Sequence, residues 1–280
     1  MGSRLLRRLP LAVAIAGIAF GWIGLNLDGD YFRDAMAYWR PDLDDLYGGR
    51  RVGIMSTYLY SPAFAQLMWP FGLLPWPLFA ALWSALNLGV LVWMVGPYLA
   101  ALLFLVPGPV GDEISTGNIH LLLAATIVIG FRYPAAWSFH LLTKITPGIG
   151  ILWFAGARQW RALVIGIGAS VAIAVVSFVI APSAWFEWLE TLRLSSTIPA
   201  DEVAVIPGPL WLRGAVAALL ALAAGWLGVR WLVPVAALIA LPVPWSSGLS
   251  LLVGSLALTR ATWQAWIGDA WRTIGTRGRS

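Results

Sequence analysis

Long uncharged stretches, separated by short charged or proline-rich segments, dominate the pattern of this chain. Four of them approach or exceed the ~20 residues that a helix needs to cross a bilayer. These stretches are Leu9–Leu27, Ile114–Phe131, Ala162–Phe186 and Trp231–Thr259. Strands of a membrane barrel would instead alternate apolar and polar residues over about ten positions. The pattern therefore predicts membrane-spanning helices, whose backbone polar groups are satisfied within each segment.

Glycine and proline positions divide the remaining apolar sequence into shorter predicted elements. Residues 52–111 carry no formal charge and divide into one amphipathic piece and two spans. The piece is Pro62–Leu74, and the spans are Pro77–Val95 and, after a break at Gly96-Pro97, Tyr98–Val110. Further spans are predicted at Ile119–Phe131, Trp160–Ala181, Pro209–Val229 and, kinked by prolines, at Trp231–Leu241 and Trp245–Leu258. We expect one all-α domain over residues 1–280, a polytopic membrane helical bundle of about 8 to 10 segments, some of them half-spans.

Basic residues predict the orientation of these helices. Arg4, Arg7 and Arg8 precede the first apolar stretch, so the positive-inside rule places the N-terminus in the cytoplasm. The stretch is too long for a signal peptide and lacks a small-residue cleavage site at its end, so we expect a retained anchor. Residues 28–76 then form a first extracytoplasmic loop, residues 182–208 a second one, and residues 260–280 a basic cytoplasmic tail.

The segment Pro134–Ala157 permits two topologies. A single span would place Arg158 and Arg161 outside and would invert every later segment. Two half-spans, broken at Lys144–Pro147, place these arginines and the basic tail inside and the acidic loop at 182–208 outside. We therefore predict a broken hairpin. Irregular backbone at membrane depth is tolerated only where it is buried in protein or lines a cavity, so the break would mark a site.

Aspartates are concentrated in the first predicted loop. It holds six of the thirteen acidic residues of the chain, namely Asp28, Asp30, Asp34, Asp42, Asp44 and Asp45. Helical spacing of apolar residues predicts a surface helix over Asp30–Trp39, ended by Pro41. In a mostly apolar protein such a cluster must lie where water and substrate reach it, although any one aspartate could equally cap a helix.

Composition excludes several classes of protein. Apolar residues make up 60% of the chain, charged residues 11%, and the mean hydropathy is +0.79, which indicates an integral membrane protein. The net charge of +5 comes from basic residues at span ends, so we do not expect nucleic acid as a partner. Cysteine is absent and only two histidines are present, so we predict neither a disulfide nor a metal site.

Lys144, the only lysine of the chain, lies between two uncharged stretches. An intramembrane cation costs about 3 kcal/mol on insertion scales, so it needs a partner or a function. At the tip of a broken helix it could neutralise a phosphate group, or it could extend to the lipid headgroups. His140 precedes it by four residues and would share its face if the half-span is helical.

An ordered series of short motifs resembles glycosyltransferase family 87. These are GT-C fold mannosyl- and arabinosyltransferases that use polyprenyl-phosphate sugars to build bacterial, especially actinobacterial, envelopes. The resemblance covers residues 9 to about 165, and the chain after Ala162 is similar only in hydropathy. The motifs are Asp30-Tyr31-Phe32 with Ala35, Leu46-Tyr47, Tyr58-Leu59-Tyr60-Ser61-Pro62, Gly117-Asn118, Lys144-Ile145-Thr146-Pro147 and Arg158-Gln159-Trp160-Arg161.

The resemblance implies roles for individual residues. In this family an aspartate of the first external loop is the general base, and Asp30 matches its position, with Asp28 and Asp34 as rivals. Lys144 would bind the donor phosphate, because the departing group gathers negative charge. Tyr58 and Tyr60 would line the pocket with Asn118 and His120, and His140 is a possible catalytic support. No cofactor and no metal ion is expected.

The resemblance also implies a reaction and a location. The chain would transfer a sugar, most simply mannose, with inversion, from a polyprenyl phosphate to a lipid-linked or cell-envelope glycan. The active site would face the extracytoplasmic side of the bacterial inner membrane. Asp28-Gly29-Asp30 spells a DxD sequence, but too few carboxylates surround it for a nucleotide-sugar metal site.

Two features depart from the family pattern. Asn118 stands where a Gly-Gln pair is usual, with His120 after it, and the chain is shorter than expected for the family. The alternative function is a glycolipid-binding protein or transporter that keeps the fold without catalysing transfer. A transporter would need intramembrane sites for alternating access, whereas the charged residues here gather at one predicted face.

Overall fold

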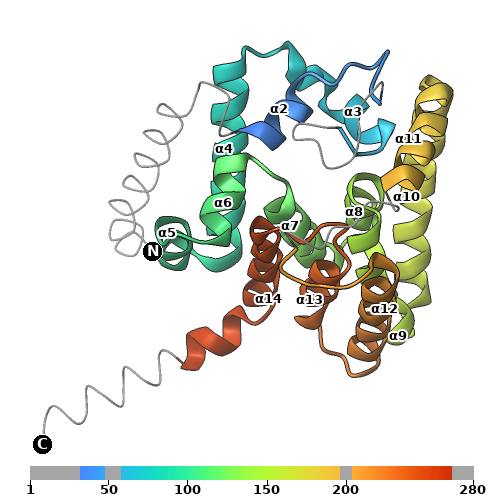
Figure 1. The fold of residues 1–280 in the computed structure, drawn as a ribbon. Coiled ribbons are helices and arrows are strands. Elements are labelled where there is room, and N and C mark those ends of the chain that lie inside the picture. The colour runs from blue at the N-terminus through green and yellow to red at the C-terminus, as the bar shows by residue number, and fades with distance from the viewer. Residues whose placement is uncertain (1–31, 48–57, 196–203, 267–280) are drawn as a thin grey trace, which may run out of the picture.

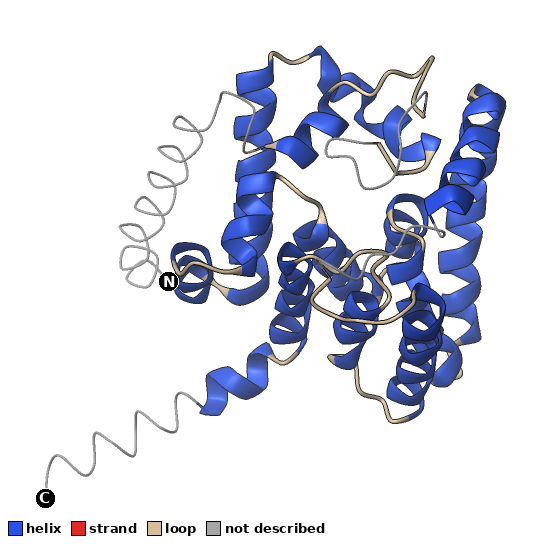
Figure 2. Cartoon of the chain, in the orientation of Figure 1, coloured by secondary structure: helices blue, strands red, loops and turns tan. Residues whose placement is uncertain are grey.

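The computed structural model describes residues 32–47, 58–195 and 204–266, and every regular element within these ranges is a helix (Figures 1 and 2). The predicted all-α class is therefore confirmed. The predicted first span at Leu9–Leu27, together with Asp28 and Asp30, lies outside the described residues, as do residues 267–280 of the basic tail.

Short helices of the first loop gather at one end of the molecule, uppermost in Figure 1. They are α2 (Arg33–Trp39), α3 (Pro62–Met68) and the 3-10 helix η1 (Trp69–Leu73). The surface helix predicted over Asp30–Trp39 is present as α2 in its described part, and the predicted piece Pro62–Leu74 is formed by α3 and η1. Prolines start α3 and η1, because a fixed φ suits the first helical positions and the missing N–H has no partner there.

Two described helices are long and apolar enough to cross a membrane, α4 (Trp76–Val95) and α10 (Trp160–Ile180). They stand on opposite sides of the molecule in Figure 1. Most of α10 faces outward with exposed apolar side chains, among them Val171, Val175 and Val179. Such a surface suits lipid contact, because lipid tails are as apolar as these side chains. Shorter apolar helices lie between the two, and the predicted number of membrane segments stays a prediction.

The predicted span Tyr98–Val110 is not one straight helix. The chain instead forms α5 (Pro97–Leu105) and α6 (Pro109–Thr116), which are bent by 83° from each other. The physical reason is the sequence Val106-Pro107-Gly108-Pro109, where two prolines remove backbone donors and disfavour helical geometry in the residues before them. The bend brings α6 back beside α4 and carries the chain into α7 (His120–Gly130).

The chain reverses direction at Lys144, as the broken-hairpin interpretation predicts. The first arm consists of η2 (Pro134–Ala136) and α8 (Trp137–Thr143), and the second of η3 (Thr146–Ile151) and α9 (Leu152–Gly156). The arms are antiparallel, because Gly148 packs against Leu141 while Gly150 packs against Trp137. The orientation of this hairpin in the membrane stays a prediction.

The second predicted external loop, residues 182–208, contains a helix where none was expected. This helix, α11 (Pro182–Ser195), starts directly after α10. Its Trp188 is buried and donates a hydrogen bond of 3.2 Å to the carbonyl of Leu59, so the helix packs onto the first loop. Charged residues such as Glu187 and Glu190 made this segment read as a loop, although they face outward on one side of an amphipathic helix.

The last part of the chain forms a second folded-back arrangement. It contains α12 (Leu210–Trp226), α13 (Leu232–Ile239), η4 (Ser246–Leu252) and α14 (Val253–Leu258), and residues 260–266 are again helical. Arg213 of α12 is buried and donates hydrogen bonds to the carbonyls of Ile239, Leu241 and Pro242. These bonds satisfy carbonyl groups that the end of α13 leaves free.

Glycines allow α9 and α12 to touch along their backbones. A Cβ atom on Gly225 would lie 2.1 Å from the carbonyl oxygen of Trp153, and one on Gly156 would lie 2.0 Å from the carbonyl oxygen of Leu222. Gly214, on the same helix as Gly225, has no atom within 4 Å of its Cβ position. Alanine at Gly225 would therefore change both helix propensity and close packing, whereas alanine at Gly214 would change helix propensity alone.

We predict that Gly225→Ala destabilises the protein by about 1–3 kcal/mol, because overpacking forces the two backbones apart. Gly214→Ala should be neutral or stabilising by up to about 1 kcal/mol, the difference in helix propensity between the two residues. Thermal unfolding in detergent, followed by circular dichroism, measures both. Equal effects of the two substitutions would contradict the packing between α9 and α12.

Candidate functional site

Five side chains from distant parts of the sequence form one hydrogen-bonded group, which we call the polar cluster. Its members are Asp34, Glu113, Asn118, His120 and Lys144. They come from α2, α6, the α6–α7 turn, the first residue of α7 and the tip of the hairpin. Charged groups in a mostly apolar protein need such partners, because desolvation without compensation is costly.

Gly117 brings the turn between α6 and α7 against α2. Its φ of +69° is left-handed, a conformation that glycine adopts without strain. A Cβ atom here would lie 2.5 Å from Cβ of Ala35, so only glycine permits this approach. Trp83 donates a hydrogen bond of 2.7 Å to the Gly117 carbonyl and fixes the turn from the side of α4. Asn118 is thereby placed beside α2.

Asn118 connects a carboxyl group to an ammonium group. Its Nδ2 donates to Oδ2 of Asp34 at 2.6 Å. Its Oδ1 accepts from the backbone N–H of Ile119 at 2.8 Å and from Nζ of Lys144 at 3.3 Å. The backbone donor settles the orientation of the amide, because only the oxygen can accept. Asp34 and Lys144 are thus held on opposite sides of one amide group.

Glu113 fixes the tautomer of His120. It is fully buried and accepts the backbone N–H groups of His120 and Leu121 at the start of α7, the latter at 3.3 Å. It also accepts from Nδ1 of His120 at 2.8 Å. A carboxylate at a helix N-terminus satisfies free N–H groups and is favoured by the helix dipole. Because Nδ1 donates, Nε2 is left to accept, and Lys144 Nζ lies 2.8 Å from it.

Lys144 lies where α8 ends, with an extended backbone of φ −120° and ψ 96°. The next helix, η3, begins at Thr146, with Pro147 in its first turn, where a missing N–H needs no partner. The side chain is half-buried, and its ammonium group donates to Asn118 and His120 and lies 5.9 Å from the ring centre of Tyr60. An ammonium group has three donors, so these two bonds leave one for a further acceptor.

Asp34 is half-buried on the first turn of α2. Burial raises the pKa of its carboxyl above the usual value, and the nearby positive charge of Lys144 opposes that increase. The negative charge of Glu113 raises the pKa of Asp34 further, while the hydrogen bond from Asn118 lowers it. A carboxylate with a raised pKa takes up a proton more readily than an exposed aspartate does.

Tyrosines of the first loop line the cluster. The hydroxyls of Tyr38 and Tyr60 are 2.8 Å apart, and both side chains are buried. Tyr60 lies beside Lys144, whereas Tyr58 packs against Tyr60 and donates to the carbonyl of Ser61 at 3.1 Å. Tyr38 was not predicted, although it follows Asp34 by one helical turn, a spacing that signals a shared face.

His140 does not join the polar cluster. Its Nε2 lies 2.8 Å from the carbonyl oxygen of Leu123, so this nitrogen donates, and among the described residues Nδ1 has no partner. Since α8 ends at Thr143, Lys144 does not continue the helical face of His140. The expectation that the two share a helical face is therefore wrong. Asp28 and Asp30 lie outside the described residues, so their roles stay predictions.

Glu113 is the member of the cluster that sequence reasoning missed. It lies among residues that read as a polar turn, and its only signal was an acidic side chain seven residues before a histidine. In the described ranges, no group of three or more His, Asp or Glu side chains could hold a metal ion. The polar cluster is a chain of five groups, in which an amide and an imidazole join two carboxyl groups to one cation.

One curated relative is an enzyme of Mycobacterium tuberculosis, the polyprenol-phosphate-mannose-dependent alpha-(1-2)-phosphatidylinositol mannoside mannosyltransferase. It is 24% identical over 250 residues, which cover 71% of this chain and 58% of the relative. The match thus spans little more than half of that enzyme's length. No solved structure matches the chain.

The sequence profile of glycosyltransferase family 87 matches residues 58–264, which include Glu113, Asn118, His120 and Lys144. The matched region is more than half of the 280 residues and contains both the hairpin and the C-terminal helices. The chain therefore belongs to glycosyltransferase family 87.

Proposed function

We propose that this chain is a membrane glycosyltransferase that transfers mannose from a polyprenyl phosphate to a lipid-linked or cell-envelope glycan. The family and the name of the mycobacterial relative support this donor class, and the acceptor of that relative is a mannosylated phospholipid. The observation that carries the proposal is the polar cluster, in which Asn118 holds a carboxylate and an ammonium group on either side of one amide.

Asp34 is the general base of the proposed reaction. Its carboxylate takes the proton of the acceptor hydroxyl while the hydroxyl oxygen forms a bond to C1 of the sugar. The bond between C1 and the phosphate oxygen breaks on the opposite face, and the polyprenyl phosphate leaves with that electron pair. A neutral hydroxyl is a poor nucleophile, so a positioned base contributes to the rate. The raised pKa of Asp34 suits this role.

Lys144 stabilises the leaving phosphate. Negative charge grows on the phosphate oxygens in the transition state, and a fixed cation nearby lowers its energy. Asn118 and His120 hold the ammonium group through two of its donors. Glu113 positions His120 by fixing its tautomer, so that Nε2 accepts from Lys144 rather than competing as a donor. The cation is thus oriented before the donor binds, which avoids reorganisation during the reaction.

The choice of Asp34 differs from the first expectation, which was Asp30. Asp34 is supported by its contact with Asn118, whereas Asp30 lies outside the described residues and is supported by motif order alone. We also propose that the cluster faces the extracytoplasmic side of the bacterial inner membrane. This orientation follows from the positive-inside rule applied to the N-terminal arginines and the basic tail.

We expect Asp34→Asn to lower the rate of mannose transfer by roughly 100- to 10,000-fold, the usual contribution of a general base. Asp45→Asn is the matched control, since Asp45 is an exposed aspartate of the same loop. The measurement is transfer of radiolabel from polyprenyl-phosphate mannose to a mannosylated phospholipid by the full chain in detergent.

The same assay separates the rival interpretations of the first loop. If Asp30→Asn abolishes transfer while Asp34→Asn does not, the base is Asp30 and the proposal for Asp34 is wrong. If the wild-type chain binds the donor but transfers nothing, the alternative of a glycolipid-binding protein or transporter replaces the enzyme.

We expect Lys144→Met to lower kcat/KM for the donor by roughly 100- to 1,000-fold, because a preorganised charge at the leaving group is lost. His140→Gln is the control, since glutamine can still donate to the Leu123 carbonyl and His140 lies outside the cluster. Steady-state kinetics with varied donor concentration measure both. A larger loss from His140→Gln than from Lys144→Met would contradict these roles.

The rate of transfer should fall in acid as Asp34 gains a proton, and its acid limb should lie above the usual range of an aspartate because burial raises the pKa. Asn118→Ala removes a hydrogen bond that lowers the pKa of Asp34, so the limb should move to higher pH. The pH profile of kcat/KM gives the apparent pKa of the acid limb separately from the maximal value of kcat/KM. An unmoved limb would show that another group controls it.

A further inference from the structure

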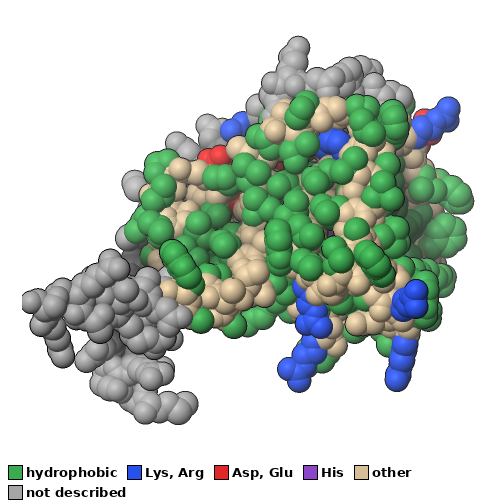
Figure 3. Space-filling view, turned by 90° about the horizontal axis from the view of Figure 1, so that it is seen from below, with side chains coloured by type: hydrophobic (Ala, Val, Ile, Leu, Met, Phe, Trp, Pro, Cys, Tyr) green, Lys and Arg blue, Asp and Glu red, His purple; other side chains and the backbone are tan. Residues whose placement is uncertain are grey.

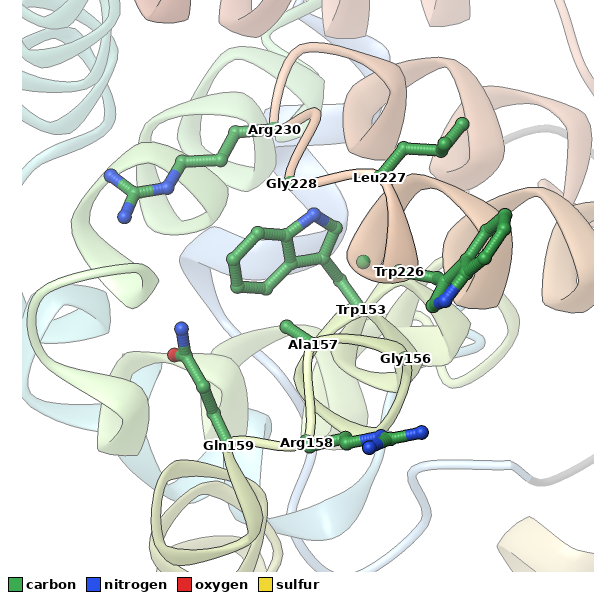
Figure 4. A pocket seen from close by; sticks show the side chains of 10 residues that line it. Trp153, Gly156, Ala157, Arg158, Gln159, Trp226, Leu227, Gly228 and Arg230 are labelled. Atoms are coloured by element: carbon green, nitrogen blue, oxygen red, sulfur yellow. The ribbon is translucent and has the colours of Figure 1, made fainter.

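A second site, a cavity of about 630 Å³, lies where α9 and α12 end (Figure 4). Helix α7 separates the two sites, since His120 is its first residue and Phe131, just past its end, packs against Trp153 of the cavity wall. Two turns form most of the wall, Gly156–Gln159 between α9 and α10, and Leu227–Arg230 between α12 and α13. None of the five members of the polar cluster lines it.

The two turns that line the cavity have restricted backbone conformations. Each contains one residue with left-handed backbone, Arg158 at φ +57° and Gly228 at φ +71°. A non-glycine residue in this region is uncommon and costs free energy. Beneath the turns, α9 and α12 touch through Gly156 and Gly225, so the floor is made of packed backbone. The cavity walls are therefore built on rigid elements.

Each turn contributes one exposed arginine to the cavity, Arg158 and Arg230. In Figure 4 they extend on different sides of the Trp153 ring. No Asp or Glu lines the cavity, and neither arginine forms an ion pair within the described ranges. The guanidinium of Arg230 lies 5.3 Å from the ring centre of Phe131 and 5.7 Å from that of Trp153. Cation–π contacts of this kind hold the side chain in place.

The remaining wall combines aromatic and amide groups. Trp153 is buried and donates a hydrogen bond of 3.1 Å to the carbonyl of Val229, which ties α9 to the turn after α12. Trp226 is 75% exposed, and Gln159 offers an amide at the rim. Figure 3 looks at the molecule from below in Figure 1 and shows basic side chains projecting from a largely hydrophobic face. Tryptophan and arginine together are typical of the level of lipid headgroups.

We propose that this cavity binds the phosphate-bearing headgroup of an anionic lipid in the leaflet opposite the polar cluster. Arginine recognises phosphate oxygens through paired N–H donors, and each of the two turns offers one arginine for such contacts at the cavity. Basic pockets between membrane helices are known to take such headgroups. The volume lies in the range of small-molecule sites. The proposal does not depend on the proposed catalytic reaction.

The experiment uses the full chain in a non-ionic detergent and titrates three probes, short-chain phosphatidylglycerol, short-chain phosphatidylcholine and inorganic phosphate. Binding is read from the saturating rise in unfolding temperature. We expect phosphatidylglycerol to bind and phosphatidylcholine not to. Arg158→Gln and Arg230→Gln should each weaken binding by about tenfold, since charge-assisted bonds to phosphate are lost.

The matched control is Arg161→Gln, which removes an exposed arginine from the same end that does not line the cavity. It should leave the affinity for phosphatidylglycerol unchanged. The unfolding temperature of each variant without lipid checks that it folds. Equal weakening by Arg161→Gln, or unchanged binding in the Arg158→Gln, Arg230→Gln double variant, would overturn the proposal. If inorganic phosphate saturates the site and its binding depends on the same arginines, the ligand is free phosphate and not a lipid headgroup.

Discussion

The hydrogen-bonded bridge from Asp34 through Asn118 to Lys144 is the interaction on which the candidate site depends. It joins residues 84 and 26 positions apart in the sequence, so α2, the α6–α7 turn and the hairpin tip must all be in place for it to form. In an apolar protein a charge without a partner is destabilising. Removing either Asp34 or Lys144 would leave the other charge uncompensated. The same bridge thus serves the fold and places an acid near a cation.

Irregular backbone makes this bridge possible. Gly117 has left-handed geometry where α2 meets the α6–α7 turn, and Lys144 has extended geometry where the hairpin reverses. A regular helix through either position would direct these side chains elsewhere. Glu113 then satisfies N–H groups that the start of α7 leaves free, and positions His120 in doing so. Backbone groups left unpaired by the breaks are therefore satisfied by the functional side chains themselves.

The sequence predicted those parts of the fold that follow from apolar length and proline position. The helices α4, α7 and α10, the piece made by α3 and η1, and the reversal at Lys144 all follow from such signals. The bend inside the span predicted over Tyr98–Val110 and the helix inside the loop predicted over 182–208 were not foreseen. In the first case the prolines between α5 and α6 outweighed hydropathy. In the second case charged residues on one face concealed a helix.

The candidate site was predictable in composition but not in connectivity. Asp34, Asn118, His120 and Lys144 could be named from residue type and motif order, yet nothing in the sequence showed which aspartate reaches Asn118. The role of Glu113 arises from a turn that only the folded chain closes, because its partners are backbone N–H groups. His140 illustrates the converse, since a helical spacing of four residues lost its meaning where the helix ended one residue early.

The short length of α7 has a consequence for the surrounding bilayer. Its 11 residues rise by about 16 Å at 1.5 Å per residue, whereas the hydrocarbon core of a typical bilayer is about 30 Å thick. One end of α7 meets the polar cluster and the other meets the arginine-lined cavity. A membrane of ordinary thickness cannot place both of these polar ends at its two surfaces. With the two sites at opposite membrane surfaces, as proposed, the lipids around the bundle must thin, or water must reach well below the headgroups to one of the sites.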